Sequence, residues 1–247
     1  MTRYNKGTPM IKKTSALLLA LLAGTSLSAQ AADWGYGNST EHWSDSYPTC
    51  GLGKNQSPIN ITSALKANLA PLRIEYNGKI TSITNNGHTV EAKVSGDNKL
   101  IVDGDTYTLK QFHFHTPSEN YIDGKQYPLE AHFVNMDDKG NIAVIAVMFE
   151  NGLRENGALS SLLKNIPTKG NTIDFTDDLS PNNLLPRERE YYQFNGSLTT
   201  PPCTEGVRWF VLETPQYSSK DQTEKLNQIM GNNNRPVQPI NARIIVE

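Results

Sequence analysis

Short segments in which apolar and polar residues alternate make up most of the middle of the chain. Asn-Gly, Asp-Gly and Gly-Asp pairs separate these segments, and such pairs are typical of tight turns between strands. Because the side chains of a strand point to alternate faces, this period of two predicts half-buried β-strands. We expect strands over residues 73–76, 88–94, 100–102, 106–115, 129–136 and 142–149.

Two helices are predicted, over residues 154–166 and 220–230. Ser219 is placed to act as N-cap of the second helix, Gln222 to complete a capping box, and Gly231 to end it. Residues 33–60 are rich in Gly, Pro, Ser and Trp, and we expect them to wrap the surface as loop. The fold class is therefore mostly β (α+β), with one domain, a large sheet and peripheral short helices.

The start of the chain has the layout of a secretory signal peptide. Lys12 and Lys13 precede an eight-residue apolar run at 16–23, and small residues follow as far as Ala31. A helix that spans a membrane needs about 20 apolar residues, so this run predicts a cleaved signal rather than an anchor. We expect residues 1–31 to be removed and residues 32–247 to form one domain, in the periplasm or secreted. Met10 is an alternative start.

Charge and cysteine content narrow the class of partner. Removal of residues 1–31 leaves 19 of the 23 basic residues against 25 acidic ones, a formal charge of −6. Nucleic acid and anionic membranes bind clustered cationic side chains, so neither is the expected partner. The two cysteines, Cys50 and Cys203, would form one disulfide in an oxidising compartment, and two free buried thiols are the alternative.

Histidines occupy corresponding faces of two predicted strands. In strand 129–136, Glu130, His132 and Val134 share a face. If this strand is the antiparallel neighbour of strand 106–115, three imidazoles can meet at one point. The alternation in strand 106–115 places Phe112 and Phe114 on one face, and on the other Tyr107, Leu109, Gln111, His113 and His115.

Three neutral imidazoles without a carboxylate or thiolate suit Zn²⁺, and three protein ligands leave one position open. Imidazoles that bind a metal usually donate their other N–H to a fixed acceptor. Gln111 lies on the face of His113, and Glu130 on the face of His132, where each could be that acceptor. The alternative is an ordinary half-buried strand with polar histidines.

Seven motifs, in order along almost the whole segment after residue 31, resemble those of an α-class carbonic anhydrase of the bacterial, secreted or periplasmic type. They are WGYG at 34–37, GKNQSPIN at 53–60, NGH at 86–88, QFHFH at 111–115, EAH at 130–132, GSLTTPPC at 196–203 and RPVQP at 235–239. The resemblance implies a central, mostly antiparallel, ten-stranded twisted sheet and a conical active-site cleft.

The resemblance also implies the chemistry, which is the reversible hydration of CO₂ to bicarbonate and a proton. One Zn²⁺ per chain would be held by His113, His115 and His132. The partners are then small molecules, namely CO₂, bicarbonate and water. Some relatives of this type form dimers, so a homodimer is an alternative to a monomer.

Further residues receive roles from the same resemblance. Thr199 would hydrogen-bond the attacking hydroxide and pass its own proton to buried Glu119. His88 would carry protons to the buffer, for which an unperturbed imidazole pKa near 6.5 is suited. Taken alone, His88 after Asn-Gly would be read as a solvated loop residue. Tyr36 and Asn86 would order the connecting waters.

The CO₂ pocket and the loop beside it complete these expectations. A bridge from Cys50 to Cys203 would pin the loop that carries Thr199, and the peptide bonds before Pro58 and Pro202 are candidates for the cis form. Any one of the apolar pocket positions, taken alone, would be read as core. The pocket positions are Val134, Val144, Leu198, Thr200, Val207 and Trp209.

Two other functions remain open from the sequence. One is a zinc hydrolase with esterase activity, because the same hydroxide could attack an ester. The other is a non-catalytic, carbonic anhydrase-related binding module. The presence of His113, His115 and His132 together with Thr199 and Glu119 favours the enzyme.

Overall fold

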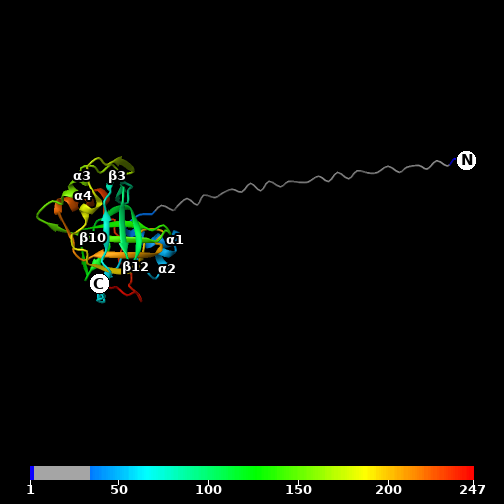
Figure 1. Cartoon of the computed structure of the whole chain (residues 1–247), viewed down its shortest axis with the longest axis horizontal. Coiled ribbons are helices and arrows are strands. Elements are labelled where there is room, and N and C mark those ends of the chain that lie inside the picture. The colour runs from blue at the N-terminus through cyan, green and yellow to red at the C-terminus, as the bar shows by residue number, and fades with distance from the viewer. Residues whose placement is uncertain (3–33) are drawn as a thin grey trace. The chain divides into compact units, whose positions relative to one another are not determined.

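A computed structural model describes residues 1–2 and 34–247 of the chain (Figure 1). Two units are distinguished, Met1–Ala32 and Asp33–Glu247, and everything below concerns the second. The predicted signal peptide and its cleavage after Ala31 fall almost entirely outside the described residues. They stay predictions.

One large sheet holds most of the second unit. Within the described residues it contains eleven strands, in the path β11-β3-β4-β6-β9-β10-β13-β12, with β5 pairing β6 and β2, and β14 pairing β10. Pairing is mostly antiparallel, but β10 runs parallel to β13 and β14. The strands are β2 (Arg73–Tyr76), β3 (Lys79–Asn85), β4 (Val90–Ser95), β5 (Asn98–Val102), β6 (Asp105–His115), β9 (Leu129–Met136), β10 (Ile142–Gly152), β11 (Asn171–Asp174), β12 (Tyr191–Ser197), β13 (Glu205–Leu212) and β14 (Gln216–Ser219).

The predicted class of mostly β fold is confirmed. Within the described residues the sheet has eleven strands rather than the predicted ten, and its short strands β11 and β14 are both hydrogen-bonded into it. A second, three-stranded sheet contains β1 (Asn60–Ile61), β7 (Tyr121–Ile122) and β8 (Lys125–Gln126). The predicted strand 88–94 begins later, at Val90, so His88 lies in the turn before β4.

Two of the helices were predicted, and one of them is shorter than expected. Helix α4 (Lys220–Met230) has the expected capping box between Ser219 and Gln222. Helix α3 covers Gly157–Leu163 rather than 154–166, because the Asn156 side chain accepts the first free N–H groups and so fixes a later start. Pro167 follows soon after the end, as is common past a helix C-terminus. Figure 1 shows α3 and α4 together at one margin of the strands.

The segment predicted as loop is partly helical. It forms the 3-10 helix η1 (Gly37–His42) and the short α-helices α1 (Trp43–Ser46) and α2 (Thr49–Leu52). Another 3-10 helix, η2 (Pro181–Leu184), lies much later in the chain. Composition misled the prediction, because burial of an aromatic side chain organises these turns. Trp43 is buried against the Cys50–Cys203 disulfide, and its indole N–H donates to the carbonyl of Gly35.

A β-bulge divides β6 into two halves. Odd-numbered residues face the core before the bulge, and even-numbered residues face it afterwards. Against β9, Leu109 pairs with Asn135 and Gln111 pairs with Val134, so Lys110 is the extra residue. An extra residue reverses the alternation of side chains beyond it. Tyr107 and Leu109 therefore lie in the same core cluster as Phe112 and Phe114, not on the histidine face, and that part of the predicted alternation is wrong.

Two apolar clusters cover the opposite faces of the sheet. Along β10, Ile145 belongs to the larger cluster and its neighbour Val144 to the smaller, as expected for a strand buried on both sides. The second cluster lies on the face that carries the histidines, because Val144 pairs with Val134 and Ala146 with His132.

The predicted disulfide between Cys50 and Cys203 is present and joins residues 153 apart in the chain. The peptide bonds before Pro58 and Pro202 are cis, and so is the bond before Pro117, which was not predicted. Among the described residues, the search for a helix long and apolar enough to cross a bilayer finds none.

Candidate active site

Three imidazoles meet where β6 and β9 lie side by side. His113 pairs directly with His132 across the two strands, and His115 follows two residues further along β6 on the same face. The ring centroid of His113 lies 5.0 Å from that of His115 and 5.4 Å from that of His132, and the third separation is 4.6 Å. One nitrogen from each ring lies within 4.8 Å of the other two.

The second nitrogen of each ring lies close to an oxygen atom. His113 Nδ1 lies 2.9 Å from the Gln111 side-chain oxygen, and His132 Nε2 lies 2.9 Å from Glu130 Oε1. His115 Nδ1 lies 2.7 Å from the main-chain oxygen of Asn233. These contacts orient the rings and leave Nε2 of His113, Nε2 of His115 and Nδ1 of His132 to face one another.

The donor set fits zinc. Within the described residues, His115 Nε2 is a buried nitrogen without a hydrogen-bond partner. Such an atom is costly unless something coordinates it. The cluster consists of three imidazoles, and three nitrogen ligands are typical of a catalytic zinc site with an open position.

The electrostatics keep these rings neutral, which is the form that binds metals. Burial lowers the pKa of His113 and His132 well below the usual value, and repulsion from His115 adds to the effect. Burial also lowers the pKa of His115, although its contact with the Asn233 carbonyl works in the other direction. Neutral ligands need no proton loss before the metal binds.

Glu130 is a fully buried carboxylate with several donors. The backbone N–H groups of Glu119 and Asn120 donate to its Oε2, at 2.6 and 2.9 Å. The Asn120 side chain donates to its Oε1 at 2.8 Å. Burial raises the pKa of Glu130, while these donors oppose the shift by stabilising the anion. The contact of Glu130 with His132 is thereby held in one orientation.

Glu119 is a second buried carboxylate next to the cluster. Its Oε1 accepts from the backbone N–H of Arg235 at 2.8 Å, and its Oε2 lies 3.4 Å from His115 Nε2. Burial raises the pKa of Glu119 well above its usual range, and interactions with Arg235 and with the Thr199 side chain partly oppose this. The buried Thr199 therefore lies beside the carboxylate that the sequence assigned to it.

Arg235 anchors this carboxylate to the N-terminal segment. Its guanidinium donates to the carbonyls of Cys50 and Ser57, at 2.8 and 2.7 Å, and to Gln56 Oε1 at 2.9 Å. Burial lowers the pKa of Arg235 to about 10, so the side chain stays cationic. The backbone that holds Glu119 is thus fixed by three further contacts.

A cleft of about 140 Å³ opens onto the metal-binding cluster. His88 lies in it with its ring stacked on Trp34, at 4.0 Å between centroids and 14° between planes. Asn86 Oδ1 accepts from the backbone N–H groups of His88 and Thr89, which fixes the turn. The cleft is lined by Trp34, Tyr36, Asn86, His88, Thr89, Glu91, Gln111, His113, His115 and Thr200.

The apolar pocket positions gather on one side of the site. Val144, Val207 and Trp209 are buried in the smaller core cluster, and two half-buried positions, Val134 and Leu198, pack against it. The Trp209 ring centroid lies 4.9 Å from that of His132. Three of these residues thus belong to the core and two pack against it, and the cluster borders the three histidines.

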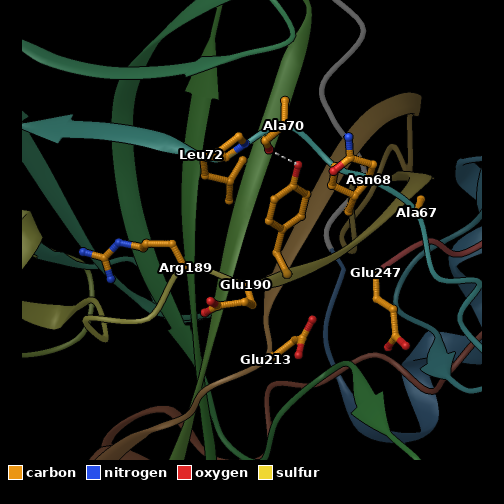
Figure 2. Close-up of a pocket in the computed structure, with 11 residues that line it drawn as sticks. Ala67, Asn68, Ala70, Leu72, Arg189, Glu190, Glu213 and Glu247 are labelled. Atoms are coloured by element: carbon orange, nitrogen blue, oxygen red, sulfur yellow. Dashed lines mark hydrogen bonds between the residues drawn. The ribbon is translucent and has the colours of Figure 1, made fainter.

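A larger cavity of about 330 Å³ lies elsewhere and has a different character (Figure 2). It is bordered by residues 67–72 and by the carboxylates of Glu190, Glu213 and Glu247. Burial, together with repulsion from Glu247 and Glu190, raises the pKa of Glu213. None of the three clustered histidines lines this cavity, so the cleft is the candidate active site.

Sequence reasoning missed two contributions to the site. Asn233 and Arg235 act through their backbone atoms, an oxygen toward His115 and an N–H toward Glu119. Because every residue has these atoms, no side-chain pattern could have identified them. The motif RPVQP at 235–239 was the nearest signal.

This fold and site are those of a class of metalloenzyme in which three imidazoles on neighbouring strands of a twisted sheet are arranged so that they could hold one metal beside a cleft. The model of the eukaryotic-type carbonic anhydrase family matches residues 38–247. The chain belongs to this family, the α-class carbonic anhydrases, and is an enzyme of that class.

Individual relatives agree with the family match. The carbonic anhydrase of Neisseria gonorrhoeae is 43% identical over 258 residues, covering 100% of both chains. That of Pectobacterium carotovorum is 46% identical over 93% of this chain and 98% of its own. The solved α-carbonic anhydrase of Photobacterium profundum is 60% identical, with a TM-score of 0.85, over 87% of this chain and 100% of its own.

Proposed function

We propose that the chain catalyses the zinc-dependent, reversible hydration of CO₂ to bicarbonate and a proton, with His88 as proton shuttle. The observation that carries the proposal is the cluster of three imidazoles, kept neutral by their surroundings, of which His113 and His115 line the cleft. His113, His115 and His132 would hold one Zn²⁺. Bound there, zinc makes a hydroxide nucleophile available near neutral pH, an effect for which carbonic anhydrase is itself the standard example.

Gln111, Glu130 and the Asn233 carbonyl hold the three ligands in place. Each accepts or faces the ring nitrogen that points away from the cluster. Removing such a partner typically costs 10- to about 100-fold in metal affinity or activity. We therefore assign these groups to ligand orientation rather than to contact with substrate.

Thr199 and Glu119 would orient the nucleophile. The Arg235 N–H occupies Glu119 Oε1, so Oε2 is the oxygen available to the Thr199 hydroxyl. A hydroxyl that donates to Glu119 can only accept at its oxygen from the reacting hydroxide. That hydroxide then directs a lone pair toward carbon. This requires ionised Glu119; burial raises the pKa of this carboxyl and opposes ionisation, whereas the interactions with Arg235 and Thr199 favour it.

Carbon dioxide would sit against the apolar cluster beside the ligands. Val134, Val144, Leu198, Val207 and Trp209 supply the apolar side, and Thr200 the polar rim. Attack of hydroxide oxygen on the carbon forms the C–O bond of bicarbonate while one C=O electron pair moves to oxygen. Water replaces the product, and one proton must then leave for each turnover.

His88 would take that proton outward. Its ring lies in the cleft that also contains His113 and His115. Tyr36 and Asn86 line the same space, and burial raises the pKa of the Tyr36 phenol, which keeps it a neutral hydrogen-bonding group. We infer that these two residues order the waters between the metal and His88.

Stopped-flow CO₂ hydration by the zinc-loaded protein tests the proposal, with His113→Ala as the matched control. Hydration by the wild type no faster than by His113→Ala would refute it. For His88→Ala, turnover should fall at low buffer concentration and recover in part with imidazole. Hydrolysis of an ester with no CO₂ hydration would favour the zinc hydrolase, and inactivity in both assays a binding module.

We also propose that the mature enzyme begins near residue 32 and acts in the periplasm or outside the cell. The disulfide between Cys50 and Cys203 supports this, because such bonds persist in oxidising compartments. Mass spectrometry of the exported protein should find a start within a residue or two of position 32. A retained leader, with Cys50 and Cys203 reduced, would contradict the proposal.

A further inference from the structure

Asn233 joins separate backbone segments of the active site through one fully buried side chain. Its Oδ1 accepts from the Thr116 N–H at 2.8 Å. Its Nδ2 donates to the carbonyls of His88 and Phe114, at 3.0 and 2.9 Å. Its own main-chain oxygen lies 2.7 Å from Nδ1 of His115. One residue therefore contacts both a metal ligand and the turn of the proposed shuttle.

The amide orientation is fixed by these partners. A flipped amide would direct oxygen at two carbonyls and a donor at an N–H group, so every contact would become repulsive. A buried amide with one acceptor and two donor contacts is also costly to leave unpaired. The Asn233 side chain is therefore a rigid link rather than an adaptable one.

The link lies where the sheet itself provides no connection. Pairing between β4 and β6 extends from Lys93 to Glu91 and stops there, opposite His113. Beyond that point, hydrogen bonds from side chains connect the two segments in place of backbone pairing between β4 and β6. Thr89 Oγ1 donates to the Phe114 carbonyl at 2.6 Å, and Asn233 bridges the His88 and Phe114 carbonyls.

We propose that Asn233 is a positioning residue whose side chain couples the His88 turn to the His115 end of the metal site. The proposal rests on the function proposed above. Asn233 acts through two other residues and does not touch the reacting atoms. Loss of its side chain should loosen the His88 turn while the three imidazoles remain, so proton transfer should suffer more than CO₂ attack.

Kinetics can separate these two effects. The ratio kcat/KM reports the steps up to bicarbonate release, whereas kcat at low buffer includes the proton transfer through His88. We expect Asn233→Ala to lower kcat at low buffer about tenfold, because displacements of the order of 1 Å can cost up to about 100-fold. We expect kcat/KM to change by less than about threefold, and imidazole to restore kcat.

A double-mutant cycle tests whether the effect passes through His88. In a His88→Ala background, Asn233→Ala should lower kcat no further. Asn232→Ala is the matched control, because Asn232 is the exposed neighbour and contacts Asn227 instead. It should leave both constants unchanged. An equal loss of kcat with and without His88 would overturn the inference.

Hydrogen exchange in the wild type gives a second readout that needs no variant. Zinc loading should slow exchange of the Asn233 side-chain amide protons and of the Thr116 N–H, because the His115 contact tightens the same residue. The Gly78 N–H is the control, since it donates to the Asn98 side chain, which is not among the cleft residues. Equal exchange with and without zinc at Asn233 and Thr116 would overturn the proposed coupling.

Failure of the inference differs from failure of the proposed function. Absence of CO₂ hydration in the zinc-loaded wild type would refute the function. Hydration that depends on His88 but not on Asn233 would leave the function intact and refute the coupling. If Asn233→Ala does not fold, the exchange comparison in the wild type decides.

Discussion

Removal of the disulfide should destabilise this protein strongly, because the bond closes a very long loop. Cys50 and Cys203 are 153 residues apart. In the chain-entropy model, opening a loop of that length gives the unfolded chain enough freedom to lower the free energy of unfolding by about 5 kcal/mol. The double variant Cys50→Ala, Cys203→Ala removes the bond. Cys203 has a φ of 56°, and alanine also has a Cβ, so the substitution adds no new backbone restriction there.

Urea unfolding at a fixed zinc concentration measures this loss. The denaturant slope should also rise, because an unfolded chain without the cross-link exposes more surface. Wild type in a thiol reductant is the matched comparison, since reduction breaks the bond and keeps both sulfur atoms in the core. A loss below about 1 kcal/mol in both samples, with an unchanged slope, would refute the loop-closure argument.

Three further predictions concern the metal site and the core. Gln111→Ala should weaken zinc binding by 10- to about 100-fold in a chelator competition, because His113 loses its oriented partner. Phe112→Ala should lower the free energy of unfolding by about 3–5 kcal/mol in urea, because this ring is fully buried against two other phenylalanines. Metal-free protein should lose stability as pH falls below about 6.5, because unfolded imidazoles then bind protons that the buried ones, with lowered pKa values, do not. The raised pKa values of Glu119 and Glu130 act in the opposite direction, because the folded carboxyls bind protons at a higher pH than the unfolded ones do. Unfolding midpoints measured between about pH 7.5 and 5.5 give the net change in stability.

Local patterns predicted the central strands well because those strands are regular there. The period of two predicted that Gln111, His113 and His115 share one face. The pairing of β6 with β9 confirms this, because the three residues alternate regularly along the part of β6 that follows the bulge. The same rule failed at Tyr107 and Leu109, because it has no means of detecting one inserted residue. A bulge depends on both strands, and the sequence of one strand does not reveal it.

Elements that depend on distant partners were harder to predict. Strands β3, β12 and β13 were not predicted, although β12 and β13 pair along most of their length. The turns around Trp43 are organised by the disulfide, whose second cysteine lies far along the chain. Asn233 and Arg235 supply backbone atoms to the site, and such contacts exist only once the chain has folded.

The extra residue at Lys110 matters less to the site than the number of residues that follow it. Lys110 is exposed, so most substitutions at this position should be tolerated. Deleting it would leave one regular alternation with Leu109 still on the core face and His113 on the other, because residues 109 and 111 already pair with consecutive residues of β9. One residue inserted or deleted between Gln111 and His115 would instead turn His115 toward the apolar core. A protein engineer could thus replace or omit this lysine but could not change the length of the segment that carries the histidines.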